Sequence, residues 1–459
     1  MLVPALLREQ ASRTPDRPAL IVDGIAELTY GQWEAASNRL ARALVARGLK
    51  PGDRVGLVYG NADAHRFAIA YMAVHKAGGV NVPLNTRLAE AEQRRIIVHS
   101  GMSVLLRGDE RLDTTAYSDA PFQVTRSADD LADILYTSGT TGAPKGVACE
   151  HGNITWVGAT GAGMLLEGGK FLHAVPVFTF AGAHAMMLIP LRHGMTSIVQ
   201  PRFDPARFLA LIEQHEVVMA FAVPSMVLLM LEQQPAPRAS LRLLMYGTAP
   251  MPPTAIHRLA EVFPNAMLVN MYGLTEGGAV VCSLPPHEAQ KRPTSVGKPV
   301  PPAEVRIAED GEVWLRGPVR PRRYYRDDDA TRATWTDDGW LRTGDIGYLD
   351  ADGYLYLVDR KKDLIIRGGF NITAAEIEGV LLEHPRVRDA AVVGIPHPVL
   401  GEDTKAFVVG DAITAGELEA FCRERLADYK VPRTYELVAA LPRNALGKVL
   451  KRELRGGAA

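Results

Sequence analysis

Apolar runs typical of strands alternate with helical patterns through most of the first 280 residues. Residues 53–60 (DRVGLVYG) predict a buried strand, residues 64–79 a helix, and residues 79–83 (GVNVP) the next strand. Such alternation is typical of βα units, whose strands form mostly parallel sheets covered by helices. The chain is therefore predicted to have an α/β fold, with mostly parallel sheets in a large N-terminal region.

One helix in this region carries signals at both of its ends. Thr29 and Gln32 stand three residues apart and predict a capping box, in which each side chain bonds the other residue's backbone N–H. Gly48 follows the helical stretch and is predicted to close it, since glycine tolerates the left-handed backbone found past a helix C-terminus.

The pattern changes after residues 285–302, a proline-rich stretch that we predict to be an exposed connector. Short alternating strands follow it. Hairpin turns are predicted at Asp310-Gly311 and at Asp352-Gly353, because Asp-Gly favours the tight turns that join antiparallel strands.

After Arg360 the chain restarts as a small α+β unit. Two capping boxes are predicted to open its helices, Thr373 with Glu376 and Thr414 with Glu417. The segments DAAVVGI and TKAFVVG supply strands between those helices.

Length and composition favour more than one domain. The chain has 459 residues, of which 47% are hydrophobic, and this is enough to bury more than one core. We predict an N-terminal domain of residues 1–361 and a C-terminal domain of residues 362–459.

Charge and cysteine content exclude several classes of protein. Lys plus Arg number 51 and Asp plus Glu 52, which argues against binding to nucleic acid or to an anionic membrane through net positive charge. Cys149, Cys282 and Cys422 are far apart and odd in number, so neither a disulfide scaffold nor a Cys-based zinc site is expected. A reducing, cytoplasmic location fits, and the first residues show no secretory signal.

Two apolar stretches invite comparison with membrane spans. Residues 217–231 fall short of the roughly 20 residues that a span needs. Residues 171–191 are interrupted by Pro176 and Gly182. Both stretches are predicted to be buried α/β core, and no membrane span is expected.

The segment YTSGTTGAPKGV, residues 136–147, carries the strongest chemical signal. Its glycines let backbone N–H groups approach phosphate oxygens, its hydroxyls donate hydrogen bonds, and Lys145 adds positive charge. The Walker A spacing is absent, which disfavours a P-loop NTPase. From composition alone this segment is a candidate phosphate-binding loop, and the alternative is a flexible loop that binds nothing.

This loop resembles the signature of the adenylate-forming superfamily, which includes acyl-CoA synthetases, carrier-protein adenylation domains and beetle luciferases. The family's other segments follow in order along essentially the whole chain: YGTAPM (246–251), MYGLTE (271–276), GWLRTGD (339–345), DRKKDLIIRGGFNITAAEIE (359–378) and PRNALGK (442–448). The resemblance implies a large N-terminal region with a small β-barrel-like part, and a mobile C-terminal domain. It also implies an AMP-forming carboxylic acid–CoA ligase that uses ATP, magnesium (Mg²⁺) and CoA.

The resemblance implies a role for each residue of a nucleotide site. Tyr272 is expected to stack on adenine, Asp345 and Arg360 to bind the ribose, and Glu276 to ligate Mg²⁺ with Thr137 as a second ligand. The implied ATP- and AMP-binding residues are Thr137, Ser138, Gly139, Thr140, Thr141, Gly142, Lys145, Gly247, Thr248, Ala249, Met271, Tyr272, Gly273, Thr275, Asp345, Arg360 and Lys448.

Lys448 matches the family's C-terminal catalytic lysine, although a lone Lys in such a loop is normally solvated surface. An anionic carboxylate must approach an anionic α-phosphate, and an ammonium lowers the electrostatic cost of that approach. Lys448, Glu276 and Thr137 are therefore the expected catalytic residues.

The implied chemistry has two halves. The carboxylate first attacks ATP to give an acyl-adenylate and pyrophosphate, and a thiol then displaces AMP. Between the halves the small domain is expected to swing about a hinge at Lys362, which brings Gly368 and Gly369 to the thiol side.

The acyl pocket is expected to be mostly apolar. Thr179 stands where domains that activate α-amino acids carry an Asp, so an apolar carboxylic acid is favoured as substrate. Thr179 also departs from the His of many acyl-CoA synthetases, and Thr373-Ala374 and Pro302 are further departures without a functional account. The expected lining is Phe178, Thr179, Phe180, Ala181, His184, Phe221, Val223, Met226, Gly277 and Gly278, beside Met271.

Several alternatives remain open at this point. A ligase that loads the phosphopantetheine thiol of an acyl carrier protein, or one that stops at the adenylate, would carry the same motifs. Luciferase-type oxidation and a non-catalytic nucleotide-binding module are less favoured. The identity of the acid and the oligomeric state are not encoded in these motifs.

Overall fold

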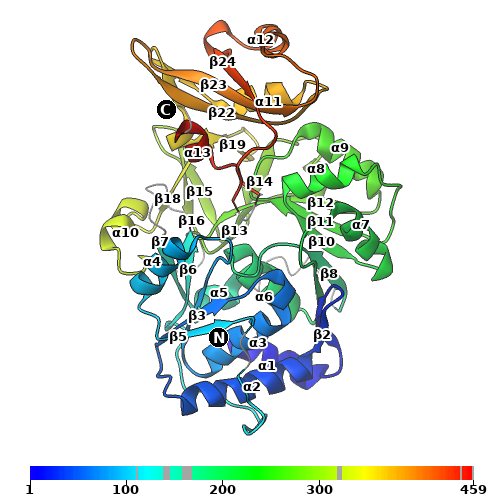
Figure 1. The fold of residues 1–459 in the computed structure, drawn as a ribbon, viewed down its shortest axis with the longest axis vertical. Coiled ribbons are helices and arrows are strands. Elements are labelled where there is room, and N and C mark those ends of the chain that lie inside the picture. Colours follow the sequence, from blue (N-terminus) through cyan, green and yellow to red (C-terminus); the bar gives the residue numbers. More distant parts are fainter. Residues whose placement is uncertain (110–111, 138–144, 158–167, 318–322, 445–446, 457–459) are drawn as a thin grey trace. The chain divides into compact units, whose positions relative to one another are not determined.

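The computed structural model describes all residues except 110–111, 138–144, 158–167, 318–322, 445–446 and 457–459 (Figure 1). The chain divides into two compact units. The first comprises residues 1–293, 299–304 and 315–341, and the second comprises residues 294–298, 305–314 and 342–459.

The first unit contains a mostly parallel run of strands in the order β13-β12-β11-β10-β8-β9-β1-β2. Neighbours from β12 to β1 pair in parallel, and the outer pairs β12–β13 and β1–β2 are antiparallel. The strands are β1 Pro18–Val22, β2 Ala26–Thr29, β8 Lys170–His173, β9 Thr196–Val199, β10 Met219–Ala222, β11 Leu243–Gly247, β12 Met267–Leu274 and β13 Ala279–Leu284. This confirms the predicted α/β fold with mostly parallel strands.

A second sheet of the first unit has the strand order β17-β7-β6-β4-β3-β5. Its strands β5, β3, β4 and β6 pair in parallel, whereas β6–β7 and β7–β17 are antiparallel. The strands are β3 Arg54–Val58, β4 Val80–Pro83, β5 Val104–Arg107, β6 Leu131–Thr137, β7 Lys145–Glu150 and β17 Arg323–Tyr324. The predicted strands at 53–60 and 79–83 are confirmed as β3 and β4.

Helices fill the connections between these strands (Figure 1). The predicted capping box of α2 is confirmed, because the Thr29 hydroxyl accepts from the Gln32 N–H and the Gln32 side chain accepts from the Thr29 N–H. Gly48 follows that helix with φ +95°, as expected. The α-helices are α1 Val3–Arg13, α2 Tyr30–Ala46, α3 Ala64–Lys76, α4 Glu90–Ser100, α5 His151–Val157, α6 Met187–Arg192, α7 Pro205–Gln214, α8 Pro224–Glu232, α9 Pro253–Val262 and α10 Asp328–Thr334.

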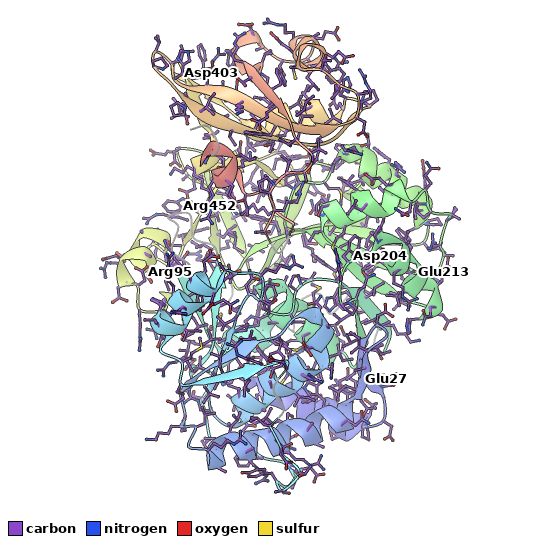
Figure 2. The ribbon with its side chains drawn as sticks, viewed as in Figure 1. Glu27, Arg95, Asp204, Glu213, Asp403 and Arg452 are labelled. Carbon is purple, nitrogen blue, oxygen red and sulfur yellow. The ribbon has the colours of Figure 1, made fainter. Side chains whose placement is uncertain are left out.

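Two further features of the first unit bear on the predictions. Asp204, labelled in Figure 2, caps α7 by accepting from the Arg207 N–H at 2.7 Å. The apolar stretch 217–231 forms the buried strand β10 and the helix α8, as predicted. No helix within the described ranges is both long and apolar enough to cross a membrane.

The strands β15, β16, β18, β19 and β14 are neighbours in that order and correspond to the predicted region of short strands. Its strands are β14 Ser295–Pro299, β15 Glu304–Ile307, β16 Glu312–Arg316, β18 Leu341–Leu349 and β19 Leu355–Arg360. Gly311 and Gly353 have φ +81° and +80°, so both predicted turns use glycine's left-handed freedom. The prediction that 285–302 is an exposed connector is partly wrong, because β14 pairs with β19 and Ser295 is fully buried.

The C-terminal sheet has the order β21-β20-β23-β22, with β24 paired to β23. Its strands are β20 Ile365–Arg367, β21 Phe370–Ile372, β22 Val387–His397, β23 Gly401–Gly410 and β24 Thr434–Leu437. The helices α11 Ala374–Leu382 and α12 Ala415–Arg423 pack Ile377, Leu381 and Leu418 against Val392 and Val408 of the sheet. Leu454 of α13 Lys451–Gly456 packs with Val393 and Phe407 in a second cluster.

Of the two capping boxes predicted here, one is confirmed and one is wrong. Thr414 and Glu417 form the reciprocal pair at α12. At α11 the helix begins after Thr373, but the Thr373 side chain makes no cap bond. The Glu376 carboxylate is held instead by Lys430 Nζ, at 2.7 and 2.8 Å, and the Ala375 N–H donates to Asp359 Oδ2 at 3.3 Å.

Candidate functional site

Two strand ends frame the predicted phosphate loop. Thr137 is the last residue of β6 and Lys145 the first of β7, and the two are partners in the antiparallel register. The expected loop residues Ser138, Gly139, Thr140, Thr141 and Gly142 lie outside the described residues. The segment therefore joins two antiparallel strands, whereas a Walker A loop opens a helix.

Three oxygen-bearing side chains meet beside this strand end. The Thr137 hydroxyl donates to Glu276 Oε1 at 3.3 Å, and the Tyr324 hydroxyl donates to the same oxygen at 3.1 Å. A carboxylate beside a hydroxyl is the hard oxygen donor set that Mg²⁺ takes together with phosphate oxygens and water. Glu276 and Thr137, predicted as metal ligands from separate motifs, thus fit a Mg²⁺ ion held jointly with a nucleotide.

Tyr324 was not identified from the sequence. It lies on β17, packs edge-on against Trp335 with ring centroids 5.2 Å apart, and has the Lys145 ammonium 5.0 Å from its ring centroid. Burial and the negative charge of Glu276 raise the pKa of Tyr324, so its hydroxyl keeps its proton as a donor. The sequence RRYYRDDD around it has no pattern that distinguishes a site residue from a surface strand.

The predicted adenine wall is a site of close backbone contact. Gly247 lies opposite Met271 in the parallel register of β11 and β12, and a Cβ at Gly247 would stand 2.2 Å from the Met271 carbonyl oxygen. Thr248 has φ +73°, an uncommon conformation for a residue with a side chain, and strain of this kind clusters at functional sites. Thr248 and Ala249 are exposed, while Tyr272 is only 8% exposed.

The turn after β12 carries Glu276. The Gly277 and Gly278 N–H groups both donate to the Leu274 carbonyl, and Gly278 has φ +74°. Gly273 is exposed, and Thr275 and Glu276 are partly exposed. This tight turn presents the carboxylate next to β6.

The predicted acyl wall is largely buried and apolar. Phe178, Phe221, Val223 and Met226 are each at most 8% exposed, and Phe180 and Ala181 are partly exposed. The Thr179 hydroxyl donates to the Pro176 carbonyl at 2.8 Å and accepts from the Gly182 N–H at 3.1 Å. The polar group of Thr179 is thus used within its own turn.

His184 lies against the predicted acyl wall, with its ring centroid 5.4 Å from that of Phe180. Its side chain is fully buried, and Nε2 lies 2.6 Å from Asp133 Oδ2. The imidazole of His184 is therefore bonded within the core and is not exposed at the predicted wall.

The predicted ribose pair belongs to the second unit. Asp345 on β18 and Arg360 on β19 are register partners, with Arg360 Nε 2.6 Å from Asp345 Oδ1. The Asp345 N–H donates to the Thr343 hydroxyl, and Asp345 is 5% exposed. Both side chains are thereby fixed at neighbouring positions of one hairpin.

Lys448 lies on a tight loop of the same unit. The Lys448 N–H donates to Asn444 Oδ1 at 2.9 Å, and the Lys448 carbonyl accepts from the Asn444 N–H at 2.8 Å. Crowding by surrounding protein and the positive charge of Arg360 lower the pKa of Lys448 to about 8, although the residue remains exposed. The loop thus holds an amine that titrates closer to neutrality than an ordinary lysine.

The predicted hinge and thiol-side residues lie on short connections. Lys362 is the centre of the 3₁₀ turn Lys361–Asp363, whose flanking residues are anchored by Lys361–Asp310 and Asp363–Arg455 ion pairs of 2.7 and 2.9 Å. Gly368 and Gly369 form the turn between β20 and β21 with φ +56° and +86°. Successive left-handed residues are what a two-residue hairpin turn requires.

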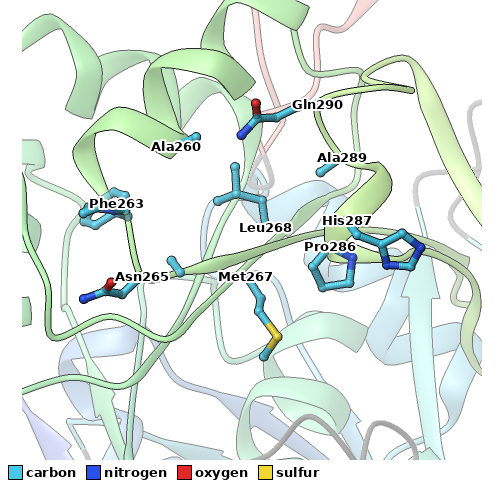
Figure 3. A pocket seen from close by; sticks show the side chains of 11 residues that line it. Ala260, Phe263, Asn265, Met267, Leu268, Pro286, His287, Ala289 and Gln290 are labelled. Atoms are coloured by element: carbon cyan, nitrogen blue, oxygen red, sulfur yellow. The ribbon is translucent and has the colours of Figure 1, made fainter.

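A separate hollow of about 390 Å³ lies where α9 ends and β12 begins (Figure 3). Phe263, Met267, Leu268 and His287 are among the residues that line it. None of the predicted site residues belongs to its lining. We assign it no role.

Family models match the chain in two places. Residues 7–325 match the AMP-binding enzyme model, and residues 376–448 match the AMP-binding enzyme C-terminal domain.

Relatives match over nearly the full length. Feruloyl-CoA synthase of Amycolatopsis is 36% identical and covers 97% of both chains, and 2-succinylbenzoate–CoA ligase of Bacillus subtilis is 34% identical, covering 98% of this chain and 97% of the relative. A Mycobacterium tuberculosis CoA ligase, named for a propanoyl chain on a methyl-dioxo-octahydroindene ring system, is 36% identical and covers 99% and 98%. Among solved structures, o-succinylbenzoate CoA synthetase of Bacillus subtilis with its acyl-adenylate has a TM-score of 0.89 at 33% identity, covering 98% and 97%.

The chain therefore belongs to the AMP-binding enzyme family, and the resemblance to the adenylate-forming superfamily is confirmed. Within that family it is an ATP-dependent acid–CoA ligase that uses ATP, Mg²⁺ and CoA.

Proposed function

We propose that this ligase activates an apolar carboxylic acid as its acyl-adenylate and then transfers the acyl group to CoA. The observation that carries the proposed substrate class is the acyl wall of Phe178, Phe221, Val223 and Met226, all of them nearly buried. The Thr179 hydroxyl makes both of its hydrogen bonds within its own turn and so offers no polar group to the acid. A pocket built from such groups favours an acyl chain or ring without a second charge, because a buried charge without a partner is costly.

The proposed nucleotide site in the first unit uses five side chains. Lys145 and the backbone of its loop bind the phosphates, and Glu276 with Thr137 would hold Mg²⁺, which supplies charge neutralisation at the phosphates when bound. Tyr324 orients Glu276, since its hydroxyl bonds the Oε1 atom that Thr137 also contacts. Tyr272 and the Gly247–Ala249 backbone are assigned to adenine.

In the second unit Asp345 and Arg360 are assigned to the ribose, and Lys448 to the reacting atoms. The Lys448 ammonium is proposed to lie between the attacking carboxylate oxygen and the α-phosphate as negative charge develops. The Asn444 loop supports this role, because it fixes the backbone of Lys448 at two points.

We further propose that residues 362–459 form a domain that moves relative to residues 1–361 between the half-reactions. Lys362 lies between two anchored neighbours, which concentrates any rotation at that residue. After rotation the Gly368-Gly369 turn is assigned to the thiol side.

The state of the cysteines supports a cytoplasmic location for the enzyme. Cys149, Cys282 and Cys422 are all buried and form no disulfide. Disulfides persist in oxidising compartments and are rare in the cytosol. The proposed setting is therefore the cytoplasm.

A screen of acids tests the proposed substrate class. ATP–pyrophosphate exchange is measured with octanoate, benzoate, ferulate, 2-succinylbenzoate, a bicyclic propanoic acid and an α-amino acid. We expect aromatic or aliphatic acids whose only charged group is the reacting carboxylate to support exchange, and the α-amino acid to give none. Exchange that is fastest with a doubly charged or zwitterionic acid would contradict the proposal.

The acceptor is tested with the best acid of that screen. We expect acyl-CoA and AMP to form with CoA alone. An adenylate that accumulates with CoA but clears with a phosphopantetheinylated carrier protein would instead support the carrier-loading alternative.

The pH dependence of adenylation follows from the lowered pKa of Lys448. The amine carries its charge below a pH of about 8 and loses it above, so exchange measured as kcat/KM should fall as pH rises past about 8. Lys448→Arg, whose guanidinium stays charged, should shift this alkaline limb upward while lowering the maximum. An alkaline limb at the same pH in the arginine variant would contradict the assignment.

A further inference from the structure

A buried polar cluster lies behind the acyl wall in the first unit. Asp133 on β6 is fully buried, and its Oδ2 accepts from the Tyr71 hydroxyl at 2.5 Å and lies 2.6 Å from His184 Nε2. His75 Nε2 lies 3.3 Å from Oδ1 of the same carboxylate. Although burial alone would raise it, His75, His184 and Tyr71 hold the pKa of Asp133 below its usual value, so a carboxylate stands inside the core.

A buried cluster of this kind does not by itself make the folded protein more stable. A buried carboxylate loses its hydration, and well-packed apolar side chains in place of a buried ion pair are often equally stabilising. Buried titratable groups with charge partners are found disproportionately at functional sites. Core packing alone therefore does not account for the cluster, and a functional role is the better explanation.

His184 lies on an unusual piece of backbone. Residues Ala181–Met186 form a π-helical turn directly before α6. Such turns are rare in proteins overall, but those that occur are often found at functional sites. The turn begins directly after Thr179 and Phe180 of the acyl wall. A Cβ at Gly182 would stand 2.1 Å from the Pro176 carbonyl oxygen, so the chain is tightly folded here.

One side chain links the cluster to the acyl wall. The Phe180 ring packs edge-on against the His184 ring, with centroids 5.4 Å apart and planes at 75°, and Phe180 is only partly buried. On the other side Asp133 lies on the strand that ends at Thr137. The Asp133–His184 bond thus ties the acyl wall to the strand that carries a predicted phosphate and Mg²⁺ ligand.

We propose that Asp133 and His184 are positioning residues for acid binding, which hold Phe180 and its turn at a fixed place relative to the end of β6. This inference rests on the proposed acyl pocket. The pair does not touch the acid and takes no part in proton transfer. It sets the shape of the acyl pocket, so its loss is felt in the binding of the acid more than in the binding of ATP.

The test compares Asp133→Asn and His184→Leu with wild type in ATP–pyrophosphate exchange, using the best acid of the screen above. We expect the KM for the acid to rise about tenfold in each, as for loss of a hydrogen bond to a charged group, with the KM for ATP within twofold. His184→Gln places an amide N–H near the position of Nε2 and should recover most of the loss.

A matched control uses the ion pair of Lys76, which follows His75 of the cluster on helix α3. Lys76 is fully buried and pairs with Glu34 at 2.7 Å; its ammonium also donates to Ser37 and Asn38, and none of these partners belongs to the predicted acyl wall. Glu34→Gln breaks a buried ion pair and should lower the melting temperature without a selective change in the KM for the acid. A Phe180→Ala background gives a second control, in which Asp133→Asn should add little because the wall it positions is gone.

The outcomes separate the two proposals. No exchange by wild type with any acid of the screen overturns the proposed substrate class. Normal exchange by wild type, with the KM for acid and ATP changing equally in Asp133→Asn and His184→Leu, or not at all, overturns the positioning role alone. Should Asp133→Asn fail to fold, the comparison of His184→Leu with His184→Gln decides the same question.

Discussion

The Lys448→Ala enzyme is expected to lose acid-dependent ATP–pyrophosphate exchange by about 10²–10³-fold or more, the cost typical of removing one preorganised electrostatic group. Carboxylate and α-phosphate are both anionic. The ammonium therefore stabilises the transition state, in which both anions meet at the five-coordinate phosphorus, more than it stabilises the separate reactants. Thiol attack on a finished adenylate has no such like-charge encounter. The same variant should therefore convert a supplied acyl-adenylate and CoA into acyl-CoA at close to the wild-type rate.

The control for this variant lies three residues further on. Lys451 is paired with Glu378 at 2.8 Å and has no assigned role in the reaction. Lys451→Ala should leave exchange within a few-fold of wild type, because its ammonium is paired with Glu378 and takes no part in the proposed reaction. Loss of this largely buried pair should instead lower the melting temperature. Equal losses of both half-reactions in folded Lys448→Ala would contradict the assignment of Lys448 to adenylation.

The Lys362→Pro enzyme should show the opposite pattern. Proline fixes φ near −65°, so the backbone can no longer absorb the rotation proposed between the half-reactions. We expect exchange to persist, whereas acyl-CoA formation from a supplied adenylate falls by at least about tenfold. Rapid-quench measurement of both half-reactions on the same preparation gives the comparison.

Lys362→Ala separates the backbone from the side chain in this experiment. It removes the ammonium but leaves φ free, so it should keep both half-reactions close to wild type. An alanine variant as defective as the proline variant would assign the effect to the lysine side chain. Unimpaired thiol transfer in Lys362→Pro would contradict the rotation itself.

Much of the fold follows from local sequence. The alternation of strands and helices, the Asp-Gly turns and two of the three capping boxes depend on residues close together in the chain, and the structure contains them. The exceptions depend on distant partners. β14 was missed because its pairing with β19 joins residues some sixty positions apart. Glu376 was expected to pair with Thr373, but its carboxylate is bound by Lys430, 54 positions further along the chain.

The candidate site divides in the same way. Thr137 and Glu276 were predicted from separate motifs, and the structure places them in contact. Tyr324 and Asp133 were missed, because each matters only through a partner far along the chain. His184 was expected near the acid; the structure places it on a π-helical turn, packed against Phe180 and bonded to Asp133, a partner 51 positions earlier in the chain.

The central claim is that an oxygen of the acid attacks the α-phosphorus of ATP. It is tested most directly by running the complete reaction with an acid labelled with ¹⁸O at both carboxylate oxygens. One labelled oxygen should leave in AMP and the other should stay in the acyl-CoA, because the bond broken by the thiol is the one between the acyl carbon and the bridging oxygen. Unlabelled AMP, or label in pyrophosphate or inorganic phosphate, would contradict the account.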